Sequence, residues 1–382
     1  MIRLVEDTID NNDIDNLVSW LQTYPRLTKG QLTIEFEQKW SNWIGCKHSL
    51  FVNSGSSANL IILAALKFGN YLANNKILVP GLAWATDLAP VMQLGFEPVL
   101  CDINLNTLSV DLGKLEHVFA TEKPSCMLLV SVLGLVPDMD AILNLCNEYN
   151  VVLVGDHCES FGSKYKGKKL GNCGEIASTF SMYFGHHLST IEGGMVCTND
   201  SELFDILLMI RSHGWSRDLS KEKQKALQSE WNVNDFNNLY TFYYPGFNLR
   251  ATDLQAKIGL GQLDKADAIC VNRNQSFNLY KKYIKNNELP LPVDENNFIS
   301  AFAYPYVNKN IEKLIPLLSK NNIDCRPLIC GSMGKQPMYV KNYAPLNLTN
   351  CDILDKYGIY LPCHDKLKEA DIEYISQIVN SI

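Results

Sequence analysis

The chain has 382 residues, a hydrophobic content of 46% and a formal net charge of −7, which suits one large domain and a smaller one. The negative charge argues against a nucleic acid partner, because proteins that bind the phosphate backbone usually carry an excess of Lys and Arg. The 12 cysteines include no CxxC pair, so we expect reduced thiols and no metal site, disulfide framework or iron–sulfur cluster.

The amino-terminal segment is acidic and lacks the apolar core of a signal peptide. No run of apolar residues reaches the length of a membrane span, so we expect a cytoplasmic protein that does not bind a membrane. Apolar residues recur at helical spacing in residues 13–21 and 32–44. Both segments are predicted to be helices whose apolar faces pack in the core.

A short predicted strand, 49–52, leads through a turn of small residues into an apolar helix, 60–66. Backbone amides at the amino end of a helix bind phosphate well, and the hydroxyls of Ser56 and Ser57 add further donors beside Gly55. Ser and Gly are also common helix caps and turn residues. The turn by itself therefore leaves capping and phosphate binding open.

Further strands are predicted in alternation with helices, which indicates an α/β fold with a largely parallel sheet and helices on both faces. These strands are 76–80, 98–102, 126–132 and 151–154. Trp84 follows the first of them, and Asp156 and Glu159 follow the last. Without further context, Trp84 would be a core residue and Asp156 a turn cap.

Two histidines, His186 and His187, lie between an aromatic run and a Glu-Gly-Gly turn. Residues 179–184 begin by alternating small polar and large apolar side chains, which predicts a strand with one buried face. The histidines are therefore expected near a strand end, where α/β proteins place catalytic groups. A His pair beside a turn is, however, more often structural than catalytic.

After a predicted helix, 201–209, come His213, Trp215 and Arg217. They suit contacts with a nucleotide diphosphate sugar, although the segment is also a plausible helix end with a Gly cap. Residues 221–244 show no clear periodicity and are predicted to be a long loop over the active site. A helix at 251–263 and a mixed segment beyond it predict a smaller α+β domain, so we divide the chain into 1–248 and 249–382.

Residues 178–199 resemble the cofactor-attachment segment of the DegT/DnrJ/StrS sugar aminotransferases, and ordered motifs extend this resemblance from Arg26 to about Arg326. The family has fold type I and uses pyridoxal 5'-phosphate (PLP). Its pattern is an aromatic-Ser-aromatic run, a Lys and then Glu-Gly-Gly, and here His186 occupies the Lys position. A lysine amine can both attach PLP as a Schiff base and move a proton, whereas imidazole can only move the proton.

Within the family, the His-His-(x)4-Glu-Gly-Gly segment resembles the nucleotide-linked 4-keto-6-deoxyhexose 3-dehydratases, the branch that contains the colitose-pathway enzyme. This implies removal of the C3 hydroxyl to give a 3,6-dideoxy-4-keto sugar. Pyridoxamine 5'-phosphate (PMP) would be the working form of the cofactor, His186 the base, and L-glutamate the amino donor that regenerates PMP. Two alternatives stay open: a nucleotide-sugar 4-aminotransferase that works without lysine, and a non-catalytic protein that binds cofactor or nucleotide sugar. GDP is favoured by the pathway analogy alone.

The resemblance also implies roles for individual residues. Trp84 would stack on the cofactor ring, Asp156 would keep the ring nitrogen protonated, and Asn248 would reach across a homodimer interface to the partner's cofactor phosphate. The implied cofactor contacts are Gly55, Ser56, Ser57, Trp84, Asp156, Glu159, Ser181 and Asn248. The implied substrate contacts are His213, Trp215, Arg217, Arg250 and Arg326, of which Arg326 equally suits a surface ion pair.

Overall fold

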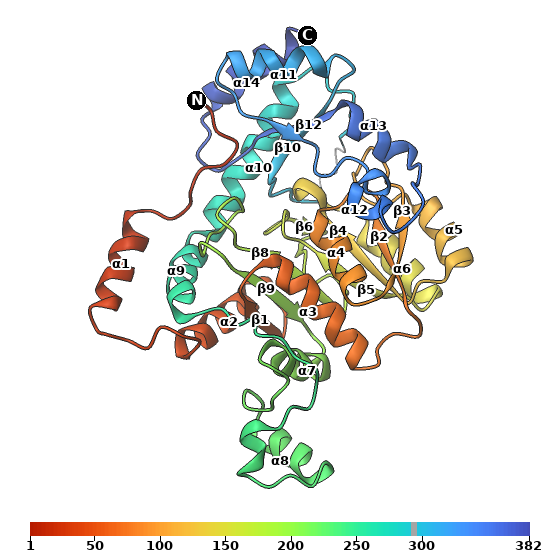
Figure 1. The fold of residues 1–382 in the computed structure, drawn as a ribbon. Coiled ribbons are helices and arrows are strands. Elements are labelled where there is room, and N and C mark those ends of the chain that lie inside the picture. Colours follow the sequence, from red (N-terminus) through yellow and green to blue (C-terminus); the bar gives the residue numbers. More distant parts are fainter. Residues whose placement is uncertain (292–295) are drawn as a thin grey trace.

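The computed structural model describes residues 1–291 and 296–382, and its larger sheet has seven strands in the order β1-β9-β8-β5-β4-β2-β3 (Figure 1). Strand β9 is antiparallel to both neighbours, and the other described pairs in this sheet are parallel. The strands are β1 (His48–Val52), β2 (Lys76–Pro80), β3 (Glu97–Cys101), β4 (Cys126–Val130), β5 (Val152–Asp156), β8 (Ala177–Ser181) and β9 (Gly194–Thr198). The predicted α/β fold is confirmed.

Helices cover both faces of this sheet. Alternate residues of β4 belong to two different cores: Leu128 packs with α3 (Gly55–Phe68) and α7 (Ser201–Arg211), whereas Met127 packs with α5 (Leu112–Glu122) and α6 (Met139–Glu148). All five residues of β4 are buried, as expected for a parallel strand covered on both sides. Helix α4 (Ala85–Gln93) follows β2.

A third core lies under β1, β9 and β8 and joins the sheet to α2 (Gln31–Ile44) and α9 (Asp253–Asp264). Phe36 and Trp40 of α2 are fully buried there, so the predicted packing of this helix is confirmed. Gly259 of α9 lets the two helices approach, because a Cβ at this position would lie 2.6 Å from the Phe36 ring. A small hairpin, β6 (Lys164–Tyr165) and β7 (Lys168–Lys169), precedes β8.

The carboxy-terminal part has its own antiparallel sheet, in the order β10-β12-β11, at the top of Figure 1. Its strands are β10 (Ala303–Val307), β11 (Arg326–Pro327) and β12 (Gly358–Pro362), and its helices are α10 (Ala266–Tyr283), α11 (Ile311–Lys320), α12 (Pro337–Val340), α13 (Thr349–Tyr357) and α14 (Glu369–Asn380). The small 3-10 helices are η1 (Val132–Gly134), η2 (Asn237–Tyr240) and η3 (Met333–Lys335). The division at residue 248 remains a prediction.

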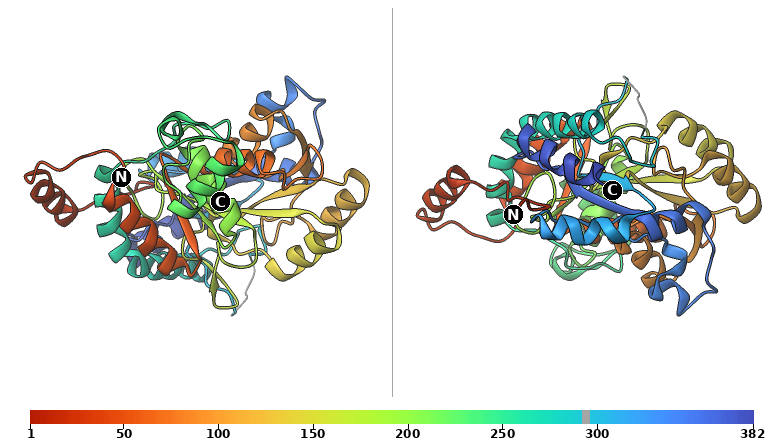
Figure 2. Two further views of the ribbon diagram at one scale, coloured as in Figure 1. Left: turned by 90° about the horizontal axis from the view of Figure 1, so that it is seen from below. Right: turned by 90° about the horizontal axis from the view of Figure 1, so that it is seen from above.

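Helix α1 (Asn11–Leu21) forms as expected but does not pack in a core. Ile14 is 46% exposed and Val18 47% exposed, and the helix lies at the edge of the molecule (Figures 1 and 2). It contacts the end of α9, where Gln262 Nε2 and Lys265 Nζ each lie 2.6 Å from Asp13 Oδ2. The expectation that its apolar face packs in the core is therefore wrong for Ile14 and Val18.

The segment 221–244 also differs from the prediction. It contains α8 (Lys221–Glu230) and η2 instead of a continuous loop, and it projects from the body at the bottom of Figure 1. Phe236, Tyr240 and Phe242 are exposed on it. Among the helices in the described part of the chain, none is long and apolar enough to cross a membrane.

Candidate active site

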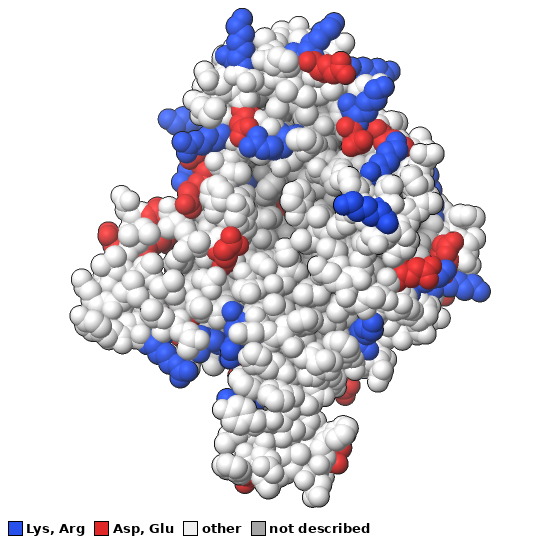
Figure 3. Space-filling view, viewed as in Figure 1, with Lys and Arg blue, Asp and Glu red and all other residues white. Residues whose placement is uncertain are grey.

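A cavity of about 490 Å³ opens at the carboxyl edge of the large sheet. Parallel strands end at a common edge, so the segments that follow β1, β2, β5 and β8 converge there. Figure 3 shows that charged side chains on this face lie mainly around the carboxy-terminal part and the outer edges, while the middle is mostly uncharged. The lining comprises Leu4, Val5, Ser54, Gly55, Ser56, Trp84, Thr86, Asp87, Val130, Asp156, Cys158, Glu159, Ser181, Tyr183, Phe184, Gly185, His186, Glu192, Phe302, Ile329 and Tyr360.

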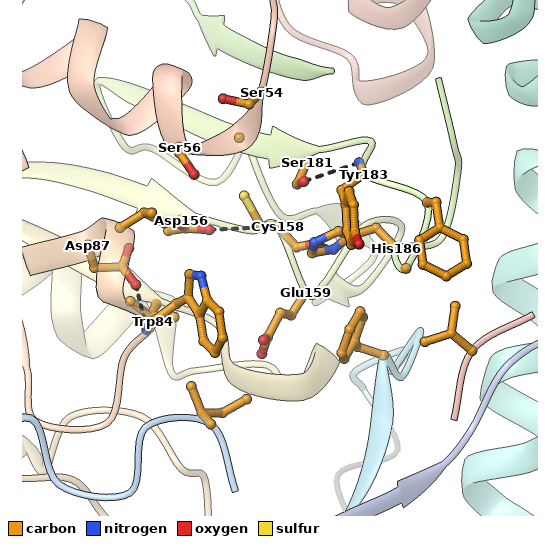
Figure 4. A pocket seen from close by; sticks show the side chains of 18 of the residues that line it. Ser54, Ser56, Trp84, Asp87, Asp156, Cys158, Glu159, Ser181, Tyr183 and His186 are labelled. Carbon is orange, nitrogen blue, oxygen red and sulfur yellow. Dashed lines mark hydrogen bonds between the residues drawn. The ribbon is translucent and has the colours of Figure 1, made fainter. Parts of the chain in front are cut away.

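One end of the cavity is the amino terminus of α3, where Ser54, Ser56 and Ser181 lie close together (Figure 4). The first amides of a helix lack partners within it and attract anions. Gly55 opens α3 against β8, and a Cβ there would lie 2.7 Å from Ser181 Cβ. Ser57 is not in the cavity lining: its amide donates to Ser54 Oγ at 3.1 Å and completes the helix cap. This end suits a phosphate group.

Trp84 and Asp156 form the middle of the cavity. Trp84 is 57% exposed although it follows a buried strand, so its indole is open to the cavity. Asp156 ends β5, and its carboxylate accepts hydrogen bonds from Asn59 Nδ2 at 2.6 Å and from the Cys158 amide at 2.9 Å. A planar aromatic ring with a protonated nitrogen suits a tryptophan platform beside a buried carboxylate.

Glu159 points into the cavity below Asp156 in Figure 4. Its carboxylate accepts a hydrogen bond from the Leu133 amide at 2.8 Å. Burial raises the pKa of Glu159 to about 7, with the Leu133 bond opposing the shift and the charge of Asp156 adding to it. The carboxyl therefore changes its protonation state near neutral pH.

His186 faces Trp84 across the cavity (Figure 4). Strand β8 ends at Ser181, not at Phe184 as predicted, because the chain turns: the Thr190 amide donates to the Met182 carbonyl and the His186 amide to the Tyr183 carbonyl, both at 2.9 Å. This turn directs the imidazole into the cavity.

The hydrogen bonding of His186 fixes its tautomer. Nδ1 lies 2.8 Å from the Cys158 carbonyl oxygen, and a carbonyl only accepts, so Nδ1 carries the hydrogen and Nε2 keeps its lone pair. Burial lowers the pKa of His186 to about 4, against the opposing effects of the Cys158 bond and Asp156. His186 is therefore a neutral base at physiological pH.

His187 has a different environment. It is fully buried, lies outside the cavity, and donates from Nε2 to the Ser300 carbonyl at 2.9 Å. Burial and the buried Arg273 lower the pKa of His187 well below its usual range. The two histidines therefore have different roles. His186 faces the cavity, and His187 connects its turn to the carboxy-terminal part.

The predicted substrate residues do not line this cavity. His213, Trp215, Arg217 and Arg250 instead form a group that we call the Trp215 cluster. The Arg217 guanidinium lies 3.9 Å from the Trp215 ring, the His213 ring lies at 5.0 Å and Arg250 at 5.6 Å. Arg217 is exposed and Trp215 and Arg250 are half-buried, and two guanidinium groups beside an indole suit an anionic, aromatic ligand.

Asn248 and Arg326 also lie outside the cavity lining. Asn248 accepts a hydrogen bond from Arg250 Nε at 3.1 Å, and the next carbonyl, of Leu249, accepts from the Asn53 amide at 3.0 Å. The segment 248–250 thus runs beside the turn that leads into α3. Arg326 is exposed and forms an ion pair with Asp324, as expected for a surface residue. In the small sheet it pairs with Tyr360, which lines the cavity.

Several lining residues were not expected from the sequence. Ser54, Asp87, Cys158 and Tyr183 are near residues that were expected, and helix-cap chemistry would have indicated Ser54. Phe302 and Tyr360 come from the carboxy-terminal part. No local pattern marks them, because they reach the cavity only through tertiary packing.

Known structures have a similar fold. A crystal structure of a GDP-4-keto-6-deoxymannose-3-dehydratase with a trapped PLP-glutamate geminal diamine superposes with a TM-score of 0.89 at 27% identity, covering 99% of this chain and 100% of that one. A variant of that enzyme with asparagine in place of a histidine, with bound GDP-perosamine, gives the same TM-score, identity and coverage. The fold and cavity therefore place the chain among the fold type I enzymes that use PLP.

The profile of the DegT/DnrJ/EryC1/StrS aminotransferase family matches residues 7–380, and the chain belongs to this family. A GDP-4-keto-6-deoxy-D-mannose 3-dehydratase of Yersinia pseudotuberculosis is 30% identical over 372 residues, which cover 94% of this chain and 93% of that protein. The resemblance inferred from the sequence motifs is confirmed.

Proposed function

We propose that the protein is a PLP/PMP-dependent 3-dehydratase that removes the C3 hydroxyl of a nucleotide-linked 4-keto-6-deoxyhexose. The observation that carries this proposal is His186, which occupies the family's lysine position and presents an unprotonated Nε2 to the cavity. Similar proteins named as 3-dehydratases support the same reaction. Because the bound sugar of one of them is GDP-linked, we propose a GDP-linked substrate.

The cavity residues fit the cofactor. Ser54, Ser56, Ser181 and the first amides of α3 would hold its phosphate, Trp84 would stack on its ring, and Asp156 would face the ring nitrogen. When bound, PMP supplies an amine that reacts with the sugar ketone and a ring that accepts an electron pair. No side chain of the cavity provides a lysine amine, so these contacts must hold the cofactor without a covalent bond.

His186 performs the proton transfer. Its Nδ1–H bond to the Cys158 carbonyl holds the ring, and Nε2 would accept a proton from C4' of a bound cofactor. The proton held at Nε2 would then be available to the departing C3 hydroxyl. Tyr183, Phe184, Phe302 and Tyr360 form an aromatic wall around this position, which limits access of water during the reaction.

We further propose a homodimer, located in the cytoplasm, in which the Trp215 cluster contacts the sugar nucleotide in the partner's cavity and Asn248 reaches the partner's cofactor phosphate. The cluster carries two cations but does not line the cavity of its own chain. The uncovered stripe of α1 and the exposed aromatic residues of segment 221–244 supply apolar surface for such an interface. L-Glutamate would enter the same cavity to regenerate PMP.

Product mass tests the proposed reaction. The protein is mixed with PLP, L-glutamate and GDP-4-keto-6-deoxymannose, and a matched sample omits glutamate. We expect a sugar that has lost one oxygen, together with ammonia and 2-oxoglutarate, only when glutamate is present. A sugar in which an amine replaces the keto oxygen would instead identify a 4-aminotransferase, and binding of PLP without any new product would identify a binding protein.

A further inference from the structure

Two buried carboxyl groups lie side by side under the cavity. Asp87 of α4 is fully buried and Asp156 is nearly so, and the two carboxyl groups are close enough for the charge of Asp156 to act on Asp87. Asn59 of α3 spans the pair: its Nδ2 lies 2.6 Å from Asp156 Oδ2 and 3.2 Å from Asp87 Oδ1. Its Oδ1 accepts from Thr179 Oγ1 at 2.8 Å, so the amide orientation is fixed.

No Lys or Arg forms an ion pair with either carboxyl in the described part of the chain, and the charged group that faces Asp87 besides Asp156 is the acidic Glu159. The other titratable groups nearby are the thiols of Cys158 and Cys330 and, beside Asp156, the imidazole of His186, whose pKa burial lowers to about 4. Two adjacent carboxylates cannot both stay ionised when buried, so the pair holds one proton.

The contacts indicate which carboxyl keeps the charge. Asp156 accepts the shorter Asn59 bond and a second bond from the Cys158 amide, and short bonds are characteristic of ionised acceptors. Burial, followed by the charge of Asp156, raises the pKa of Asp87 well above its usual range. The Trp84 amide donates to Asp87 Oδ2 at 2.9 Å, and Asp87 Oδ1 lies 3.2 Å from the Asn59 Nδ2 that also binds Asp156.

We propose that Asp87 is a positioning residue: it carries the shared proton and donates it as a hydrogen bond to Asp156, so that the negative charge of the pair faces the cofactor's ring nitrogen. This inference rests on the proposed cofactor site. It assigns to Asp87 a role that the motif around Trp84 does not indicate.

Two variants of Asp87 test whether this side chain is protonated or ionised in the folded protein. Asp87→Asn is neutral like the protonated acid and keeps its shape, an acceptor for the Trp84 amide and a donor. It gives up the 3.2 Å bond from Asn59 Nδ2, which keeps its shorter bond to Asp156. Asp87→Ala removes the donor. With PMP as the probe, followed by its fluorescence, we expect Asp87→Asn to bind within about twofold of wild type and Asp87→Ala to bind about tenfold more weakly. Equal weakening in both variants would overturn the proposal.

Thermal unfolding of the cofactor-free protein gives an independent readout. A carboxyl whose pKa is raised in the folded state loses stability as pH rises above the ordinary value of 3.8. We therefore expect the Tm of wild type to fall relative to that of Asp87→Asn as pH increases from acid to neutral. Asp111→Asn, which changes a helix cap far from the pair, is the control and should show no such difference.

Parallel Tm curves for wild type and Asp87→Asn would show that the proton is not on Asp87. This measurement needs neither cofactor nor substrate. If wild type bound no PMP while the pH-dependent Tm difference remained, the proposed function would be wrong. The assignment of the shared proton to Asp87 would still be supported. The two failures are therefore distinguishable.

Discussion

The cavity and the Trp215 cluster differ in how the chain builds them. The cavity gathers side chains from four strand ends of one sheet, so most of the residues proposed to hold the cofactor come from a single chain. The cluster joins the segment after α7 to Arg250 before α9, and it does not line that cavity. Parallel strands bring distant residues together by topology alone, whereas recognition of the sugar nucleotide on this account requires a second subunit.

The largest expected effect comes from the cavity side of this comparison. Asn at position 186 keeps a hydrogen-bonding side chain but removes the base. We expect His186→Asn to lower product formation about 10³-fold, while bound PLP, followed by its absorbance, is retained. If turnover were unchanged, His186 would not be the base, and His187 would be the next residue to test.

Subunit mixing tests the cluster side. Arg217→Ala removes one charged contact, and we expect kcat/KM to fall about a hundredfold. Co-expression of Arg217→Ala with His186→Asn should then restore activity to about a quarter of wild type, because half of randomly paired dimers are mixed and each has one intact site. Activity no higher than that of the Arg217→Ala protein would place the cluster beside its own chain's cavity and contradict the proposed dimer.

Trp84→Ala probes the cofactor platform alone. Loss of ring stacking costs about 1 kcal/mol, so we expect PMP to bind roughly fivefold more weakly while the KM for the sugar nucleotide changes little once PMP is saturating. Fluorescence titration measures the first quantity and initial rates the second. A larger effect on KM than on PMP affinity would show that Trp84 contacts the sugar nucleotide and not the cofactor ring.

The smallest expected effect concerns pH. Because Glu159 has a pKa of about 7, a reaction that uses its protonated form should slow a few-fold as pH rises through 7, and Glu159→Gln should abolish this decline. His186, with a pKa of about 4, stays neutral above pH 5 and should add no decline near pH 6.5. Rate profiles of both proteins between pH 5 and 9 test this, and an unchanged decline in Glu159→Gln would exclude Glu159 as its source.

The sequence predicts the strand-end cavity well, for a physical reason. Alternation of strands and helices implies a parallel sheet, and Trp84, Asp156 and His186 each follow one of its strands, so their convergence follows from order along the chain. Phe302 and Tyr360 could not be predicted this way. They reach the cavity through packing between the two sheets, which leaves no local pattern.

The incorrect predictions also have physical causes. Helix α8 is polar on all sides and has no buried residue, so it lacks the apolar periodicity that identifies a helix; its Ser220 cap is its clearest local signal. The stripe on α1 was correctly identified as apolar, but periodicity does not say whether the covering surface belongs to the same chain. The strand was predicted to reach Phe184 because aromatic residues continue past Ser181. It ends at Ser181 because the chain turns there.

The most direct test of the account follows the proton that His186 is proposed to move. PMP deuterated at C4' is bound to wild type and to His186→Asn, and each is mixed with GDP-4-keto-6-deoxymannose. We predict that deuterium passes to water with the wild-type protein and is retained with His186→Asn. Equal release from both proteins would show that another group removes the proton, and the central role of His186 would be contradicted.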